Sequence, residues 1–73
     1  MGHKFSLAAQ IEEVEREIGM RDVVYARRVA TNKMKAGEAA YMSERMAAVL
    51  ATLKWLQRNE ARVRAAIGPD DQV

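Results

Sequence analysis

The chain has no cysteine and only one histidine, His3, among its 73 residues. Without cysteine it has no disulfide framework and no thiolate metal site, so nothing in it requires an oxidising compartment. One histidine is too few for a His-Glu-x-x-His zinc site, and the glycines form no phosphate-binding loop. We therefore expect no catalytic residue, no metal ligand and no cofactor, and a protein that is not an enzyme.

Residues that form turns and strands are also scarce. The chain holds one proline and four glycines, and aromatic residues make up 5% of it, whereas a β-sandwich or barrel needs many turns and many β-forming residues. No run of about 18 apolar residues occurs, so we expect no membrane-spanning segment. The apolar run at residues 5–9 is too short for a secretory signal. These absences favour a cytoplasmic protein with no membrane partner.

What the chain does have is the composition of a helical protein. Hydrophobic residues make up 49% and charged residues 30% of it, which is too apolar for a disordered segment. Alanine, glutamate and arginine are common, as they are in helical chains. Because a chain of this length has room for one small core, we predict a single all-α domain over residues 1–73.

The strongest pattern is an apolar repeat in the second half of the chain. Its spacing alternates between three and four residues, which keeps one stripe of a helix turned towards a packed neighbour. The positions are Ala39, Met42, Met46, Val49, Leu53, Leu56, Glu60, Val63 and Ile67. We expect the polar member, Glu60, to be half-buried and to fix the helix register, with Gln10 or Lys4 as its partner.

A similar stripe lies in the first half, at Leu7, Ile11, Val14, Ile18, Tyr25 and Val29. Ser6 suits the N-cap of this helix. The repeat lapses at residues 31–37, where Thr31, Asn32 and Gly37 end helices or permit turns. We predict helix 1 at about 6–31, a turn at about 32–36, an unbroken helix 2 at about 37–67 and a frayed tail at 68–73.

Two long helices joined by a short turn form an antiparallel, coiled-coil-like hairpin. Such a hairpin buries one face of each helix, and several large side chains lie off the two stripes. They are Met20, Val24, Tyr41, Leu50 and Trp55. Aromatic residues are enriched where protein interfaces form. We predict that these five residues form a partner interface, most simply in a homodimer that makes a four-helix bundle.

Positive charge is concentrated in the middle of the sequence. Residues 21–35 hold five basic groups and one acidic group. The basic groups are Arg21, Arg27, Arg28, Lys33 and Lys35, and we expect them to gather at the hairpin tip. Three interpretations stay open: a solvated basic end, a surface that contacts phosphates of nucleic acid without sequence preference, or a surface that binds an acidic protein.

Four segments resemble small proteins of unknown function encoded in bacteriophages and prophages. They are residues 11–17, 24–30, 33–34 and 46–53. The resemblance covers most of the chain and implies a phage or prophage setting in a bacterial host, with no known activity and no transferable site. Where members of that group have serine or threonine just after the Lys33-Met34 position, this chain has Lys35.

These observations lead to one functional hypothesis and two rivals. The leading hypothesis is a self-associating helical hairpin that binds a host or phage protein. The first rival is a nonspecific nucleic-acid-binding protein that uses the basic tip. The second rival is a phage-encoded inhibitor of a host defence complex.

Overall fold

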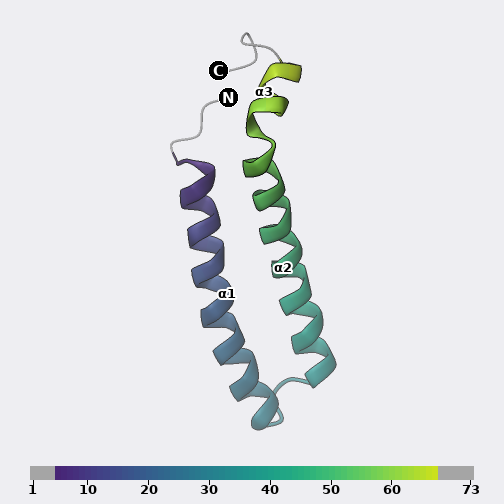
Figure 1. The fold of residues 1–73 in the computed structure, drawn as a ribbon. Helices are drawn as coiled ribbons and strands as arrows, with labels where there is room; N and C mark the ends of the chain where they lie inside the picture. The colour runs from purple at the N-terminus through teal and green to yellow at the C-terminus, as the bar shows by residue number, and fades with distance from the viewer. Residues whose placement is uncertain (1–4, 68–73) are drawn as a thin grey trace.

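The computed structural model describes residues 5–67 and contains three helices in that range. They are α1 (Leu7–Ala30), α2 (Ala36–Arg58) and α3 (Glu60–Ile67). Helices account for 87% of the described residues, which include no strand. α1 and α2 lie side by side and run in opposite directions, and α3 continues the line of α2 (Figure 1). The predicted all-α class is confirmed, whereas the predicted tail at 68–73 lies outside the described residues.

α1 begins and ends with well-formed caps. The Ser6 hydroxyl accepts a hydrogen bond from the amide of Ala9 at 3.1 Å, as an N-cap side chain does. At the other end Asn32 adopts a positive φ of 59°. The amide of Lys33 donates to the Arg28 carbonyl at 2.8 Å, and the amide of Asn32 donates to the Val29 carbonyl at 3.1 Å. This pair of bonds is a Schellman motif, which ends the helix.

α2 begins without a side-chain cap. Its N-cap residue is Lys35, whose backbone is extended (φ −79°, ψ 145°) and whose side chain makes no capping hydrogen bond. Lysine has no acceptor atom, so it cannot satisfy the free amides of the first turn. Glu38 places a negative charge in that turn, where the helix dipole favours it. The start of α2 therefore depends on the dipole and on packing against α1.

The second helical segment is interrupted at Asn59, which differs from the unbroken helix predicted over 37–67. The Asn59 side chain donates to the Trp55 carbonyl at 2.8 Å and accepts from Arg62 at 3.3 Å. Its backbone leaves the helical range at φ −113°, ψ 13°. The Asn59 amide also donates to the Trp55 carbonyl, at 3.0 Å, so the side chain adds a local bond of the kind that asparagine forms readily. The interruption divides the segment into α2 and α3.

The two long helices meet along the predicted stripes. Ile11 and Tyr25 are the buried residues of the described chain, at 7% and 9% exposure. Half-buried positions on α1 are Leu7, Gln10, Val14, Glu17, Ile18, Arg21 and Val29, and those on the α2 and α3 side include Ala39, Met42, Met46, Leu50, Leu53, Leu56, Glu60 and Val63. The core is therefore one narrow seam with few fully enclosed side chains.

Three residues differ from their expected positions. Val49 and Ile67, both assigned to the seam, are 47% and 53% exposed. Leu50, assigned to the partner interface, is half-buried instead. Val49 and Leu50 follow Met46 by three and four residues, so either one fits the seam spacing. Leucine has the larger apolar side chain, and the rotation of α2 that buries it therefore gains more from burial.

Two polar contacts join α1 to α2 beside the seam. The Ser43 hydroxyl donates to the Asp22 carboxylate at 3.1 Å, and the Lys54 ammonium lies 3.3 Å from the Glu15 carboxylate. Both contacts are exposed, so each contributes little to stability but reports the register of the two helices. Glu60 is half-buried as expected, but it pairs with Arg64 at 2.9 Å rather than with Gln10.

The packed helices form a rod of 53 × 20 × 17 Å with a radius of gyration of 16.5 Å. A compact domain of this length would have a radius of gyration of about 11 Å. Within residues 5–67, no helix has both the length and the apolar character needed to cross a membrane. The elongated shape leaves a large share of the side chains in contact with solvent.

Candidate interaction surface

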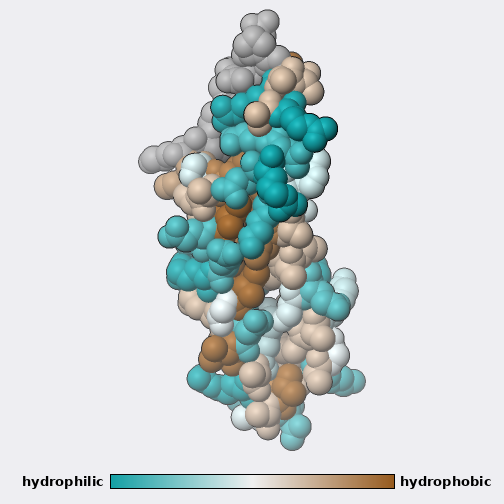
Figure 2. All heavy atoms as spheres, in the orientation of Figure 1, coloured by the Kyte–Doolittle hydropathy of each residue, from teal (hydrophilic) through white to brown (hydrophobic). Residues whose placement is uncertain are grey.

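The outer surfaces of the rod carry large apolar side chains. Exposure is 53% at Met20, 59% at Val23, 46% at Val24, 60% at Tyr41 and 51% at Trp55. Figure 2 shows hydrophobic side chains along the line between the helices, with hydrophilic and hydrophobic side chains mixed on both flanks. Four of the five predicted interface residues are thus accessible to a partner, and the fifth, Leu50, is half-buried in the seam.

The rotation of each helix assigns these side chains to one of the two broad sides of the hairpin. At about 100° per residue, Glu15 and Asp22 lie on the same flank of the α1 stripe, and they contact Lys54 and Ser43 of α2. We call the side that carries these two contacts the bridged side. Met20 and Val24 lie on the opposite flank of α1, and Tyr41 and Val49 lie on the matching flank of α2. We call this second side the open side.

Four other large apolar residues are exposed. Phe5 precedes α1 and Ile67 ends α3, and neither Val23 nor Trp55 belongs to the open side. Val23 is one residue from Val24, which turns it about 100° towards the bridged side. Trp55 lies on the face of α2 directly opposite the seam. The predicted interface residues are therefore split: Met20, Val24 and Tyr41 share one side of the hairpin, and Trp55 is separate from them.

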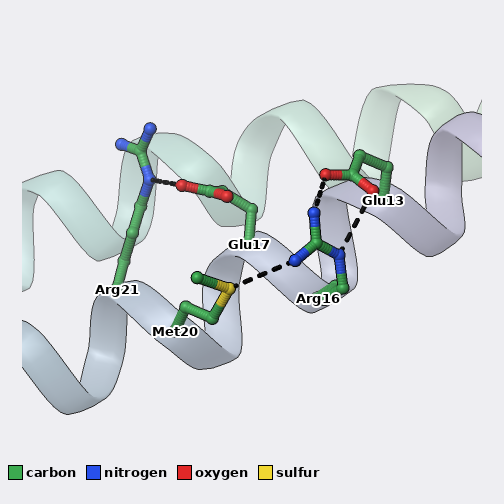
Figure 3. Close-up of polar contacts among 5 residues, drawn as sticks. All are labelled: Glu13, Arg16, Glu17, Met20 and Arg21. Carbon is green, nitrogen blue, oxygen red and sulfur yellow. Dashed lines mark hydrogen bonds and ion pairs between the residues drawn. The ribbon is translucent and has the colours of Figure 1, made fainter.

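Charged side chains on α1 form short-range pairs around Met20 (Figure 3). The Arg16 guanidinium donates to both carboxylate oxygens of Glu13, and it also donates to the Met20 sulfur at 3.3 Å. Its hydrogen bond with Glu13 raises the pKa of Arg16 above its ordinary value. These contacts hold the thioether against the helix surface and keep it on the outer edge of the open side.

Arg21 and Glu17 form the second pair in Figure 3, with the Arg21 Nε atom 2.9 Å from a Glu17 oxygen. The hydrogen bond to Glu17 is the main cause of the raised pKa of Arg21, and an interaction with the Tyr25 hydroxyl adds to it. Arg21 is half-buried and paired in the middle of α1. It therefore does not join the other four basic residues at the hairpin tip, contrary to the expected cluster.

The other four basic residues do lie at or next to the turn. Arg27, Arg28, Lys33 and Lys35 are all exposed, and none takes part in the ion pairs found among residues 5–67. The acidic residue nearest in the sequence is Glu38 for Lys33 and Lys35, and Asp22 for Arg27 and Arg28. We call these four residues the basic tip. The positive charges of the basic tip are exposed to solvent, where they can attract phosphate or carboxylate groups at low salt.

The turn also contains an open hollow. Its walls come from Val29, Asn32, Lys33, Met34, Lys35, Ala36, Gly37 and Glu38. It is a shallow surface depression, unlike the enclosed cavities that hold small ligands. Within the described part of the chain, no group of three or more metal-ligating side chains is gathered in one place. The candidate functional features of the described residues are therefore two exposed surfaces, the open side and the basic tip.

The sequence patterns could not reveal which exposed residues share a side. That grouping depends on how each helix is rotated about its axis, and the contacts of Asp22 with Ser43 and of Glu15 with Lys54 fix this rotation. Val49 was missed as a surface residue because its spacing also fits the seam. Comparisons with protein-family models, with curated proteins and with solved structures gave no match.

Proposed function

We propose that this chain is a non-enzymatic protein–protein interaction module that self-associates and also binds a host or phage protein. The observation that carries the proposal is the combination of two buried residues with a series of large apolar side chains that are about half exposed. Soluble monomers rarely expose large contiguous apolar patches unless those patches bind something.

The surface area supports the same conclusion. The chain exposes 5915 Å², whereas a compact monomeric protein of 8.2 kDa would expose about 4,500 Å². A stable dimer covers roughly 800 Å² on each partner. The hairpin therefore exposes more excess surface than one such interface would cover, and a second copy is the simplest way to cover it.

The experiment that tests self-association is sedimentation of the purified chain over a range of micromolar concentrations. A mass of two chains or more that rises with concentration supports the proposal. A folded monomer at every concentration would remove it, because the exposed apolar residues would then be tolerated without a partner. We infer from the resemblance to phage proteins that the second partner is a host or phage protein. Capture of a specific protein from host cells tests that part of the proposal, and capture of the chain alone would contradict it.

A second candidate is nonspecific binding to nucleic acid, which the four exposed and unpaired residues of the basic tip favour. With about four phosphate contacts, the logarithm of the association constant should fall with the logarithm of the salt concentration with a slope of roughly −3.6. Affinity should therefore fall about 150-fold between 50 and 200 mM salt. Replacement of Arg27 and Arg28 by glutamate should abolish such binding. The matched control replaces Arg58 and Arg62, at the far end of the rod, in the same way.

A further inference from the structure

We infer that the open side of the hairpin is the surface that binds a second copy, with the two hairpins related by a two-fold axis and their tips at opposite ends. This inference rests on the proposed self-association and specifies the side, the orientation and the contacts. The open side carries four exposed apolar residues, Met20 at 53%, Val24 at 46%, Tyr41 at 60% and Val49 at 47%.

The four apolar residues of the open side fit a two-fold axis because they form one pair on each helix, and both pairs are centred at about the same height along the rod. In an interface between identical surfaces, residue i contacts residue j of the partner, and j contacts i. Met20 and Val24 are centred on position 22 of α1, and Tyr41 and Val49 are centred on position 45 of α2. These two centres lie within about 3 Å of the same height along the rod, since Asp22 is hydrogen-bonded to Ser43, two residues before position 45. One axis therefore places Met20 against the partner's Val24, and Tyr41 against the partner's Val49.

Charges on the open side agree with the same axis. Glu17 and Arg28 lie on the same flank of α1 as Val24, and their midpoint also falls between positions 22 and 23. Antiparallel α1 helices centred there bring Glu17 close to the partner's Arg28, and this contact occurs twice in the dimer. In the monomer Glu17 bonds to Arg21 at 2.9 Å, and Arg28 has no ion pair among the described residues.

The opposite orientation, with the two tips together, is disfavoured by charge. It would place two copies of the basic tip, Arg27, Arg28, Lys33 and Lys35, against each other, and like charges in contact oppose association. Arg45 lies close to the proposed axis on α2. Its guanidinium lies over the ring of Tyr41 at 5.7 Å from the centroid, which directs it along its own helix and away from the partner's copy.

The bridged side offers a weaker surface to a second copy. Its centre is occupied by the Asp22–Ser43 and Glu15–Lys54 contacts, whose polar groups would lose water on association. The large exposed apolar residue nearest to it is Val23. Val23 and Val24 are therefore a matched pair: the same side chain at adjacent positions of one helix, both exposed, but turned towards different sides.

The test compares sedimentation of the wild type with Val24→Glu and Val23→Glu, with circular dichroism to verify helix content. The Val24→Glu change replaces an apolar contact by a carboxylate twice in the dimer, and from four residues before Arg28 this carboxylate competes with the partner's Glu17 for the Arg28 guanidinium. We therefore expect its dissociation constant to rise at least about 100-fold. Val23→Glu should change it less than about threefold. A wild-type dimer that responds equally to both changes would overturn the inference and leave self-association intact. A wild-type chain that stays monomeric would contradict both the proposed self-association and this inference.

A charge exchange tests the pairing independently of apolar contacts. Arg28→Glu alone should weaken the dimer, and Glu17→Arg alone should weaken it as well, whereas the double variant should recover most of the affinity. Absence of recovery in a double variant that remains helical would contradict the contact between Glu17 and the partner's Arg28.

Orientation can be measured directly, because the chain has no cysteine of its own. α1 ends at Ala30, eight residues or about 12 Å from position 22 at 1.5 Å per residue, and Lys33 lies in the turn beyond it. Spin labels on Lys33→Cys at opposite ends should therefore be at least about 24 Å apart along the rod. Tips brought together would give a separation below about 20 Å. Pulsed electron paramagnetic resonance separates these distances, and the shorter one would overturn the proposed orientation.

Discussion

The missing cap at the start of α2 provides the sharpest prediction about stability. Position 35 already has the extended backbone of an N-cap residue, with φ −79° and ψ 145°, but lysine has no atom that can accept a hydrogen bond from the first-turn amides. In Lys35→Ser the hydroxyl would have that role, as Ser6 has at the start of α1, where it accepts from Ala9 at 3.1 Å.

The expected gain has two parts. A serine N-cap contributes about 1 kcal/mol relative to a residue that does not cap. Glu38 lies three residues later, in the position where a glutamate bonds back to the N-cap amide and completes a capping box. Removal of the lysine charge from the positive end of the helix dipole adds about 0.3 to 1 kcal/mol. Lys35→Ser should therefore raise the free energy of unfolding by about 1 to 2 kcal/mol.

For a domain of this size, that gain corresponds to an increase in the melting temperature of roughly 5 to 10 °C. Thermal unfolding followed by circular dichroism at fixed protein concentration measures it. Lys35→Ala removes the charge without supplying an acceptor, and Lys33→Ser removes a charge of the same tip from a residue that is not the N-cap. If all three variants melt at the same temperature, the gain comes from charge alone and the capping argument is refuted.

Three further substitutions test the seam, the surface of α1 and the turn. Ile11→Ala should lower the free energy of unfolding by about 2 to 4 kcal/mol in urea titrations because Ile11 is 7% exposed, whereas Val23→Ala, on neither the seam nor the open side, should cost less than about 1 kcal/mol. Gly19→Ala should raise the free energy of unfolding by about 1 kcal/mol, since nothing lies within 4 Å of the added methyl group. A decrease would show that the backbone at position 19 requires glycine. Asn32→Val should lower the free energy of unfolding by about 1 to 2 kcal/mol because φ is 59° there, and Asn32→Gly, measured in the same titrations, should not lower it.

The sequence was sufficient for the fold class and for the seam of α1. The first stripe has one apolar residue at each required spacing except position 21, where Arg21 lies, so only one rotation of α1 buries it. On α2 the adjacent Val49 and Leu50 both fit, and their relative burial depends on the rotation of the helix against its neighbour. Spacing alone cannot separate two candidates that are 100° apart on the helix when each lies within the width of an apolar stripe.

The interruption at Asn59 is a local effect that the apolar repeat conceals. Leu56, Glu60 and Val63 continue the spacing through the break, so the repeat gives no sign of it. At the break the Trp55 carbonyl accepts both the Asn59 amide at 3.0 Å and the Asn59 side chain at 2.8 Å, a local side-chain bond that asparagine forms readily. A pattern of apolar residues reports which face is covered, and it carries little information about backbone continuity.

The candidate surface was predicted in composition but not in arrangement. Met20, Val24, Tyr41 and Trp55 were identified because they lie off the stripes, and all four are exposed. Which of them act together depends on the side of the hairpin, and that follows only when both helices are oriented relative to each other. The composition of the basic tip was likewise not predictable from sequence spacing, because Arg21 pairs with Glu17 at 2.9 Å and does not join the other four basic residues.

If the chain self-associates as proposed, its narrow core and broad exposed surface lead us to expect that folding and association are coupled. If the dimer is the stable form, unfolding releases two chains, so a tenfold increase in concentration stabilises it by about 1.4 kcal/mol. For two chains of this length, that shifts the melting temperature by roughly 3 to 6 °C. The melting temperature of Val23→Glu should rise with concentration as that of the wild type does, whereas that of Val24→Glu should stay constant over the range in which it is monomeric. A wild-type melting temperature independent of concentration would mean that the seam of Ile11 and Tyr25 holds the hairpin without help, and the excess apolar surface would then have no part in its stability.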